Sequence, residues 1–339
     1  MAVDINDVRL SVAELIAVQG DVELVSHTAG WEEVYPLAKK LRDFAVSGIY
    51  FSFEKVDRDN YVEKSKVPFS SLLRDKDVGT LEKERNTMKN LATKVGCQPK
   101  LARALELCGV EARDGDFYLN AQSLQKVNRK TRSKRERNAA LYCVQGALNF
   151  FEGGWWEVIV AHAYQVQYPQ AEVLWSAVTA NTSDRDHGVE TDVIASPDGR
   201  MLCCISCKRG VQDKVVQQLE QHSTRTAMLS GVIHKCIIAV YTERGVEKLA
   251  PLANALKMTM WDAHRVHCIE TGKEYVKNVK HAPDSQPKNA PATQVKPTLA
   301  AAPAKNLPGE EDDEFMPAAP SFLTRLKQAV AYVLTGKGM

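Results

Sequence analysis

With 339 residues, 44% hydrophobic and 25% charged, the chain has the composition of a globular protein long enough for two domains and a tail. Its net charge of only +2 excludes a strong field of one sign over the whole molecule, so any affinity for nucleic acid has to come from a local patch. The N-terminus lacks a basic start followed by an apolar run, and no apolar stretch could span a bilayer. We therefore expect neither a signal peptide nor a membrane span.

The cysteines indicate the redox environment. There are eight, and two of them, Cys203 and Cys204, are adjacent, which suits a disulfide framework poorly. Because no export signal is expected either, the simpler prediction is a cytoplasmic protein with reduced thiols.

The first 80 residues are predicted to form a small α/β module. Apolar spacing predicts helices over 8–18 and 32–46. Residues 22–25 and 48–53 are rich in β-branched or aromatic side chains and are predicted strands. The charged stretch 57–77 is expected to be mostly loop.

Residues 81–150 are predicted to be mostly helical. Thr80 is the expected N-cap of the first helix, and 101–107 forms a second. The segment 111–119 predicts a hairpin with a glycine turn. Helices followed by a short hairpin would fit a winged-helix element.

The most basic run of the chain, 128–137, lies within this region. One interpretation is a solvated loop or helix start. The other is a patch that contacts phosphates beside a catalytic cleft, which would make binding salt-dependent. On the second interpretation, the nucleic-acid-binding residues are Arg129, Lys130, Arg132, Lys134 and Arg135, together with Arg209 further along the chain.

From 151 to 280 the chain predicts an α/β domain. A helix over 156–168 precedes strands at 173–179, 187–195 and 201–208, and the last two are joined by a strong turn sequence, Ser196–Gly199. The expected architecture is a central mixed sheet flanked by helices.

Polar residues on two of these strands suggest a site. Side chains alternate on a strand, so Glu190 and Asp192 share one face, and Ser206 and Lys208 share a face of the neighbouring strand. Glu157 lies one turn into the preceding helix and can lean over that face. Each residue alone would more readily be structural or solvated, but a charged side chain on a buried strand needs a partner.

These residue types fit metal-assisted phosphodiester hydrolysis. A hard cation such as Mg²⁺ or Mn²⁺ takes oxygen ligands, polarises a phosphoryl oxygen and makes a bound water more acidic. A nearby lysine can orient that water or stabilise negative charge at phosphorus. The sequence therefore predicts a nuclease site.

Residues 153–240 resemble the nuclease domain of the PD-(D/E)XK superfamily. The similarity is nearest to the CRISPR ancillary nucleases that join such a domain to a cyclic-oligonucleotide sensor. The matching pieces are Gly154–Glu157, Glu190–Ile194 and Ile205–Lys208, followed by a predicted helix, 217–229. The resemblance implies a restriction-endonuclease-like core and defence against foreign DNA or RNA. It also implies a homodimer, Glu157 and Asp192 as metal ligands, and Lys208 as a catalytic residue.

The chain departs from the superfamily pattern at Ser206, where the residue two before the lysine is commonly acidic. Metal coordination would then depend on Asp192, Glu157, waters and the Cys207 carbonyl, with Glu190 compensating. If it does not compensate, the chain is a catalytically inactive nucleic-acid-binding or scaffolding protein with a nuclease-like fold.

A second departure concerns the sensor. In the relatives a substantial α/β domain precedes the nuclease, whereas residues 1–80 predict two strands and no sensor motif. A reduced or different N-terminal module is therefore expected.

A cysteine motif offers a competing interpretation. Cys204 and Cys207 form a C-x-x-C, and His267 and Cys268 lie downstream, so a zinc site is conceivable. On a strand, however, Cys204 and Cys207 point to opposite faces. Core cysteines are the better prediction.

The last 59 residues change in composition. Residues 281–320 are rich in proline and alanine and are predicted to be a disordered linker. Residues 321–339 predict an amphipathic helix. It could dock on its own domain, bind a partner protein as an adaptor, or, less readily given its few basic residues, lie on a membrane surface.

Overall fold

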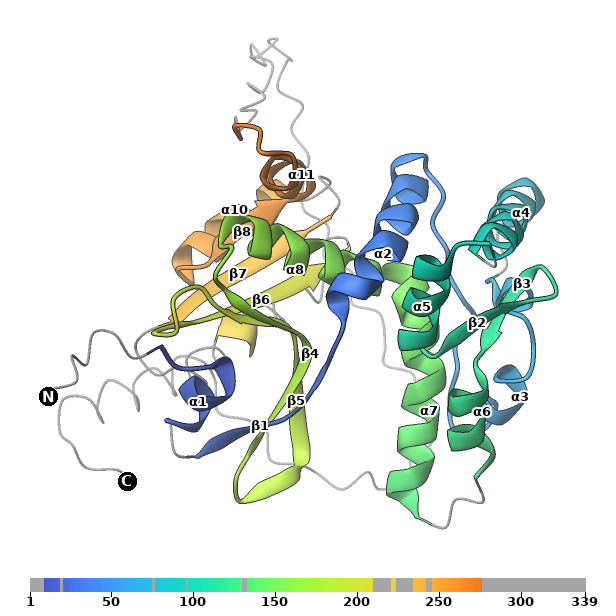
Figure 1. The fold of residues 1–339 in the computed structure, drawn as a ribbon, viewed down its shortest axis with the longest axis horizontal. Helices are drawn as coiled ribbons and strands as arrows, with labels where there is room; N and C mark the ends of the chain where they lie inside the picture. The colour runs from blue at the N-terminus through green and yellow to red at the C-terminus, as the bar shows by residue number, and fades with distance from the viewer. Residues whose placement is uncertain are drawn as a thin grey trace, which may run out of the picture. The chain divides into compact units, whose positions relative to one another are not determined.

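The computed structural model describes residues 9–18, 21–74, 77–95, 97–129, 133–209, 221–223, 234–241 and 246–275. They form a six-stranded mixed sheet flanked by helices, beside a helical lobe that carries a two-stranded hairpin (Figure 1). This confirms the predicted fold class. The predicted linker 281–320, the predicted helix 321–339 and most of the predicted helix 217–229 lie outside the described residues.

The sheet combines two kinds of pairing. Strands β1, β4, β5 and β6 are antiparallel neighbours, whereas β6, β7 and β8 are parallel. The turn between β5 and β6 lies where the sequence predicts it, with Gly199 at a positive φ of 70°. In sheet order the strands are β1 (Val22–Thr28), β4 (Glu172–Asn181), β5 (Asp184–Ser196), β6 (Leu202–Lys208), β7 (His234–Val240) and β8 (Thr259–Asp262).

Helices cover both faces of the sheet. One face packs against α8 (Trp155–Gln167), which in turn contacts α2 (Trp31–Val46) and α11 (Ala263–Thr271). The other face carries α1 (Val12–Ala17) and α10 (Val246–Ala255), each with its own apolar cluster. Within the described residues, none of these helices combines the length and apolar character needed to cross a bilayer.

The cysteines belong to this packing. Cys204 is buried in the cluster beneath α1, and Cys207 in the cluster beneath α8, so the two thiols lie on opposite faces. None of the eight cysteines forms a disulfide. This agrees with the prediction of reduced core cysteines, because a single zinc ion could not take both members of the C-x-x-C.

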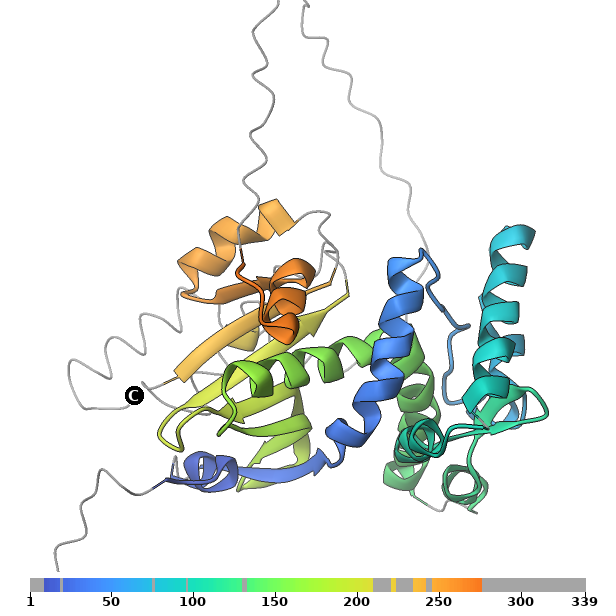
Figure 2. The same cartoon turned by 45° about the horizontal axis from the view of Figure 1, so that its top comes forward.

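Helix α7 (Lys134–Asn149) lies on the side of the helical lobe that is next to the sheet (Figures 1 and 2). Helix α7 continues through a π-helical turn, Phe150–Gly154, directly into α8, so the lobe and the sheet share one unbroken helical segment. The predicted helix at 101–107 and the hairpin at 111–119 are confirmed. The other lobe elements are α3 (Tyr61–Lys64), the 3-10 turn Phe69–Leu72, α4 (Val78–Val95), α5 (Pro99–Leu107), β2 (Val110–Arg113), β3 (Asp116–Leu119), α6 (Ala121–Asn128) and α7 (Lys134–Asn149).

Two local predictions were wrong. The segment 48–53 is not a strand; it makes one isolated bridge, between Phe53 and Leu73, because its aromatic side chains bury in the lobe rather than in a sheet. Thr80 is not the N-cap of α4. Asp77 takes that role, since its Oδ1 accepts the Thr80 N–H at 2.9 Å and the helix begins at Val78.

Strand β1 and helix α2 pack together with the central sheet and with α8, the helix that covers it. Strand β1 pairs antiparallel with β4 at the sheet edge, and α2 packs against α8. The Trp31 indole donates to the Val173 carbonyl at 3.3 Å. Residues that the sequence assigns to a separate N-terminal module therefore complete the sheet that carries the candidate site.

Candidate active site

The candidate site begins where β5 and β6 part. The two strands pair over three residue pairs, from Ala195–Cys203 to Val193–Ile205. One residue further, the Asp192 carboxylate takes up the ladder position, and its Oδ2 accepts the Cys207 N–H at 2.6 Å. The carboxylate therefore lies between the two strands, within reach of groups on β6.

Ser206 and Lys208 approach the same oxygen. The Ser206 hydroxyl donates to Asp192 Oδ2 at 3.4 Å, and Lys208 Nζ lies 3.8 Å from it. The side chains of Asp192 and Lys208 are 24% and 26% exposed, so the ion pair is open enough to meet a ligand. Asp192, Ser206 and Lys208 therefore lie close together, as the sequence predicts.

Glu157 reaches the cluster from α8. Its Oε2 accepts the Trp175 indole N–H at 2.9 Å. The residue keeps some surface in the groove, yet burial raises the pKa of its carboxyl well above the usual value, and the charges of Asp192 and Glu190 add to this rise. The Trp175 hydrogen bond and the Lys208 charge only partly oppose it. The positive charge near Glu157 is thus too small to stabilise the ionised form of its carboxyl.

Glu190 is held by an unusual residue of β4. Ser176 has a positive φ of 49°, rare for a residue other than glycine, and its hydroxyl donates to Glu190 Oε1. The β1–β4 register shifts between Ser26 and Thr28, which places a bulge here. Bulges and strained residues are over-represented beside functional sites because they redirect a side chain.

A groove and a smaller pocket open onto these carboxylates. The groove, about 680 Å³, runs from Glu157, Glu190 and Asp192 to α6 and α7 of the lobe. The pocket, about 210 Å³, is lined by Asp192, Ser206 and Lys208 together with the buried His222. Asp192 therefore lies between two openings.

Arg209 ties the end of β6 to the helix that carries Glu157. Its guanidinium donates to the main-chain carbonyls of Phe51, at 3.5 Å, and Glu152. Glu152 belongs to the π-helical turn, and Gly153 in that turn lies under the Arg209 side chain. The guanidinium is thus engaged inside the protein, and its contact with nucleic acid stays a prediction.

The predicted basic patch lies at the other end of α7. Arg129 follows α6 and Lys134 begins α7, and both are exposed. Since α7 has 16 residues, its two ends are about 22 Å apart at 1.5 Å per residue. Lys130 and Arg132, as well as the side chain of Arg135, lie outside the described residues.

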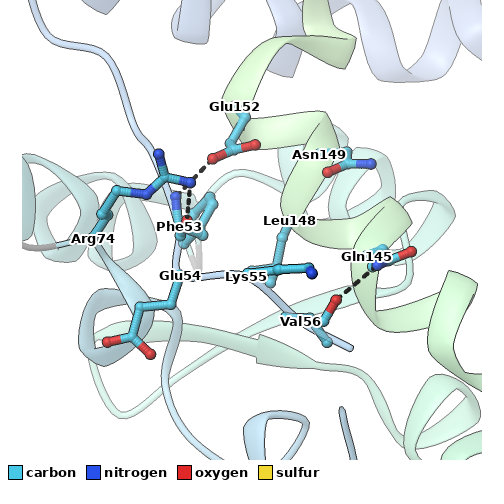
Figure 3. Close-up of a pocket in the computed structure, with 9 residues that line it drawn as sticks. All are labelled: Phe53, Glu54, Lys55, Val56, Arg74, Gln145, Leu148, Asn149 and Glu152. Atoms are coloured by element: carbon cyan, nitrogen blue, oxygen red, sulfur yellow. Dashed lines mark hydrogen bonds between the residues drawn. The ribbon is translucent and has the colours of Figure 1, made fainter. Parts of the chain in front are cut away.

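A second pocket, about 250 Å³, lies against α7 without any of the carboxylates of the candidate site (Figure 3). The Phe53 N–H donates to Glu152 Oε1 at 2.7 Å, and Arg74 donates to the Phe53 carbonyl at 3.2 Å. Gln145 donates to the Val56 carbonyl at 2.8 Å. These bonds attach segment 51–56 to α7, to the π-helical turn and to Arg74. The pocket is therefore part of the packing around α7 and not part of the candidate site.

The donor chemistry of the site suits a hard cation. Glu157, Asp192 and Glu190 offer carboxylate oxygens, and Mg²⁺ is often held by one or two carboxylates completed by waters and substrate phosphates. Among the described residues, no three His, Cys, Asp or Glu side chains form a closed metal-binding group. The metal-ligand roles of Glu157, Asp192 and the Cys207 carbonyl stay predictions.

Three residues around the carboxylates were not singled out from the sequence. Trp175 and Ser176 are consecutive on β4 and bind Glu157 and Glu190 respectively, and His222 lines the smaller pocket. The only sequence signal for the first two is their position on a strand next to the one that carries Asp192. His222 falls within the predicted helix that follows the lysine strand.

No protein-family model matches the chain, and no curated protein matches it in sequence. Among solved structures it is similar to VC1899 from Vibrio cholerae, with 14% identity, a TM-score of 0.40, and 78% of this chain and 60% of that chain covered. It is also similar to Can2 from Sulfobacillus thermosulfidooxidans in complex with cyclic tetra-adenylate, with 15% identity, a TM-score of 0.37, and 77% and 60% covered.

The chain thus spans 60% of the length of each of these two proteins. Similarity at this level carries no argument about the fold or the chemistry of this chain. The PD-(D/E)XK assignment, which rests on short motifs, stays a prediction.

Proposed function

We propose that the chain is a metal-dependent nuclease that hydrolyses phosphodiester bonds of DNA or RNA, with Glu157, Asp192 and Lys208 as its catalytic set. The observation that carries the proposal is the position of Asp192 in the gap between β5 and β6. There one carboxylate oxygen lies within reach of an amine and a main-chain N–H. The negative charge of Asp192 also acts on Glu157 and helps to raise the pKa of its carboxyl.

Charge supports a role for a cation. The groove is lined by Glu106, Glu157, Glu190 and Asp192 against one lysine, Lys126, so by itself it repels phosphate. A Mg²⁺ or Mn²⁺ ion bound by Glu157 and Asp192 would supply neutralisation, a polarised phosphoryl oxygen and a more acidic water.

The other roles belong to the chain's own groups. Lys208 can hold negative charge that develops on the phosphoryl oxygens, and the Cys207 N–H and Ser206 hydroxyl fix the orientation of Asp192. Trp175 fixes Glu157. A role in defence against foreign nucleic acid, and a homodimer, rest on the motif resemblance alone.

Incubation of the full chain with single- and double-stranded DNA and RNA, with Mg²⁺, Mn²⁺ or EDTA, tests the proposal. We expect metal-dependent cleavage that Asp192→Asn and Lys208→Ala each lower by about 100-fold or more, as loss of one key electrostatic group does in other enzymes. Asp198→Asn in the β5–β6 turn and Lys94→Ala on α4 are matched controls and should cleave normally. Cleavage that persists in EDTA, or in both site variants, would contradict it.

A second candidate is a protein that binds nucleic acid without cleaving it. Ser206 favours this candidate, because a hydroxyl that donates to Asp192 is a weaker metal ligand than the carboxylate usual at this position. Salt-sensitive binding with no metal-dependent cleavage of any of the four substrates would support it.

A further inference from the structure

One face of α7 forms a wall of the groove opposite the carboxylates. Tyr142, Gly146 and Asn149 line the groove, and their spacing of four and three residues places them on one side of the helix. At 1.5 Å per residue this face is about 10 Å long. Tyr142 is 65% exposed and lines the groove, so its ring is accessible to a ligand there.

Gly146 has no packing reason to be glycine. It lies inside α7, where glycine weakens a helix relative to alanine, and its backbone does not have a positive φ. A Cβ added at this position would meet no atom within 4 Å. The space over Gly146 is therefore open, and bare helix backbone faces the groove directly beside Tyr142.

The two walls of the groove differ in charge. Every groove-lining residue of α7 is uncharged, whereas Glu157, Glu190 and Asp192 stand on the sheet side. A neutral wall with an exposed aromatic ring and amide side chains suits nucleobases, and the acidic wall, once it holds cations, suits phosphates. The groove can therefore orient a nucleotide strand.

We propose that this face of α7 binds the bases of an unpaired nucleotide strand. One base stacks on the Tyr142 ring and lies over Gly146, the Asn149 amide hydrogen-bonds a base edge, and the backbone faces Glu157 and Asp192. Paired bases cannot bind in this way, because their faces are stacked and their edges are paired. This inference rests on the proposed function and names its substrate class as single-stranded or locally unpaired nucleic acid.

Fluorescence polarisation with short labelled oligothymidylate, oligouridylate and a DNA duplex tests the inference on the full chain, with Ca²⁺ in place of Mg²⁺. We expect Tyr142→Ala to weaken single-strand binding about 5- to 100-fold, which is the usual effect of losing one stacked base. Tyr142→Phe should bind like the wild type. Gly146→Leu should fill the open space and weaken binding, whereas Gly146→Ala should have little effect. The duplex should bind more weakly and respond to neither change.

Gly79→Leu is the matched control for Gly146→Leu, because Gly79 also lies in a helix, and a Cβ there would meet only the Asp77 side chain, at 3.6 Å. Thermal unfolding of each variant checks that it folds. Wild-type affinity in both Tyr142→Ala and Gly146→Leu would overturn the inference. So would a wild type that does not bind single strands, or equal losses on duplex and single strand.

The outcomes also separate this inference from the nuclease proposal. If the wild type cleaves nothing but binds single strands through Tyr142 and Gly146, the base-binding face stands and the nuclease proposal fails. If cleavage depends on Asp192 while both α7 variants bind normally, the nuclease proposal stands and the base-binding face fails.

Discussion

Two glutamates on neighbouring helices have pKa values that are shifted in opposite directions. Glu270 on α11 pairs with Arg42, accepts the Tyr35 hydroxyl at 2.8 Å and lies 3.6 Å from His162 Nδ1. Burial alone would raise the pKa of Glu270, but the His162 contact and the Arg42 charge outweigh it and hold the pKa below its usual value. For Glu157 on α8, burial and the negative charges of Asp192 and Glu190 all raise the pKa.

The difference separates a carboxylate that the protein itself neutralises from one that it does not. Glu270 finds its cation inside the protein and joins α2, α8 and α11. Glu157 lacks a sufficient internal cation, so it must take a proton or an external ion. Strongly perturbed carboxyls in a groove indicate functional sites more often than well-paired ones do.

The largest effect that would sharpen this comparison is on stability. We expect Glu270→Gln to lower the free energy of unfolding by about 2–3 kcal/mol, because it leaves the largely buried Arg42 without its anion. This corresponds to a fall in Tm of roughly 5–10 °C. Chemical denaturation measures it, with Glu82→Gln on the exposed face of α4 as the control. A Glu157→Gln variant that loses more stability than Glu270→Gln would break the comparison.

The next effect is protection by a divalent ion. At ten times its Kd, Mn²⁺ should stabilise the wild type by about 1.4 kcal/mol through mass action, which raises Tm by a few degrees. Thermal unfolding with Mn²⁺ or EDTA measures the shift. Asp192→Asn should abolish it and Glu270→Gln should keep it. An equal shift in all three proteins would show that the ion binds elsewhere.

The smallest effect is the pH dependence of stability. A carboxyl whose folded pKa is raised binds more protons when folded, so its contribution to stability is lost as pH rises from the usual value of 4.5 through the folded pKa. In metal-free buffer, Glu157→Gln should match the wild type at low pH. Above the folded pKa its Tm should exceed that of the wild type by roughly 2–4 °C. A constant difference across the pH range would assign the change to packing instead.

The parts of the site that could be predicted from sequence are local. Alternating side chains and the Ser196–Gly199 turn place Asp192 next to Ser206 and Lys208, since both patterns depend only on neighbouring residues. The helix before β4 and the apolar strands followed from periodicity in the same way.

What the sequence did not reveal depends on distant contacts. The parting of β5 and β6 follows from the competition between a side chain, Asp192, and the strand ladder. Strand β1 pairs with β4, which lies more than 140 residues further along the chain. Residues 48–53 do not form the predicted strand, because their aromatic side chains are buried in the core of the lobe. No local pattern distinguishes these outcomes.

The unbroken passage from α7 to α8 has a mechanical consequence. Because no loop separates them, the direction in which α7 ends determines where the first turn of α8 begins, and Arg209 donates to a carbonyl of the π-helical turn Phe150–Gly154 between them. The placement of the lobe and the position of Glu157 are therefore set by one continuous helical segment.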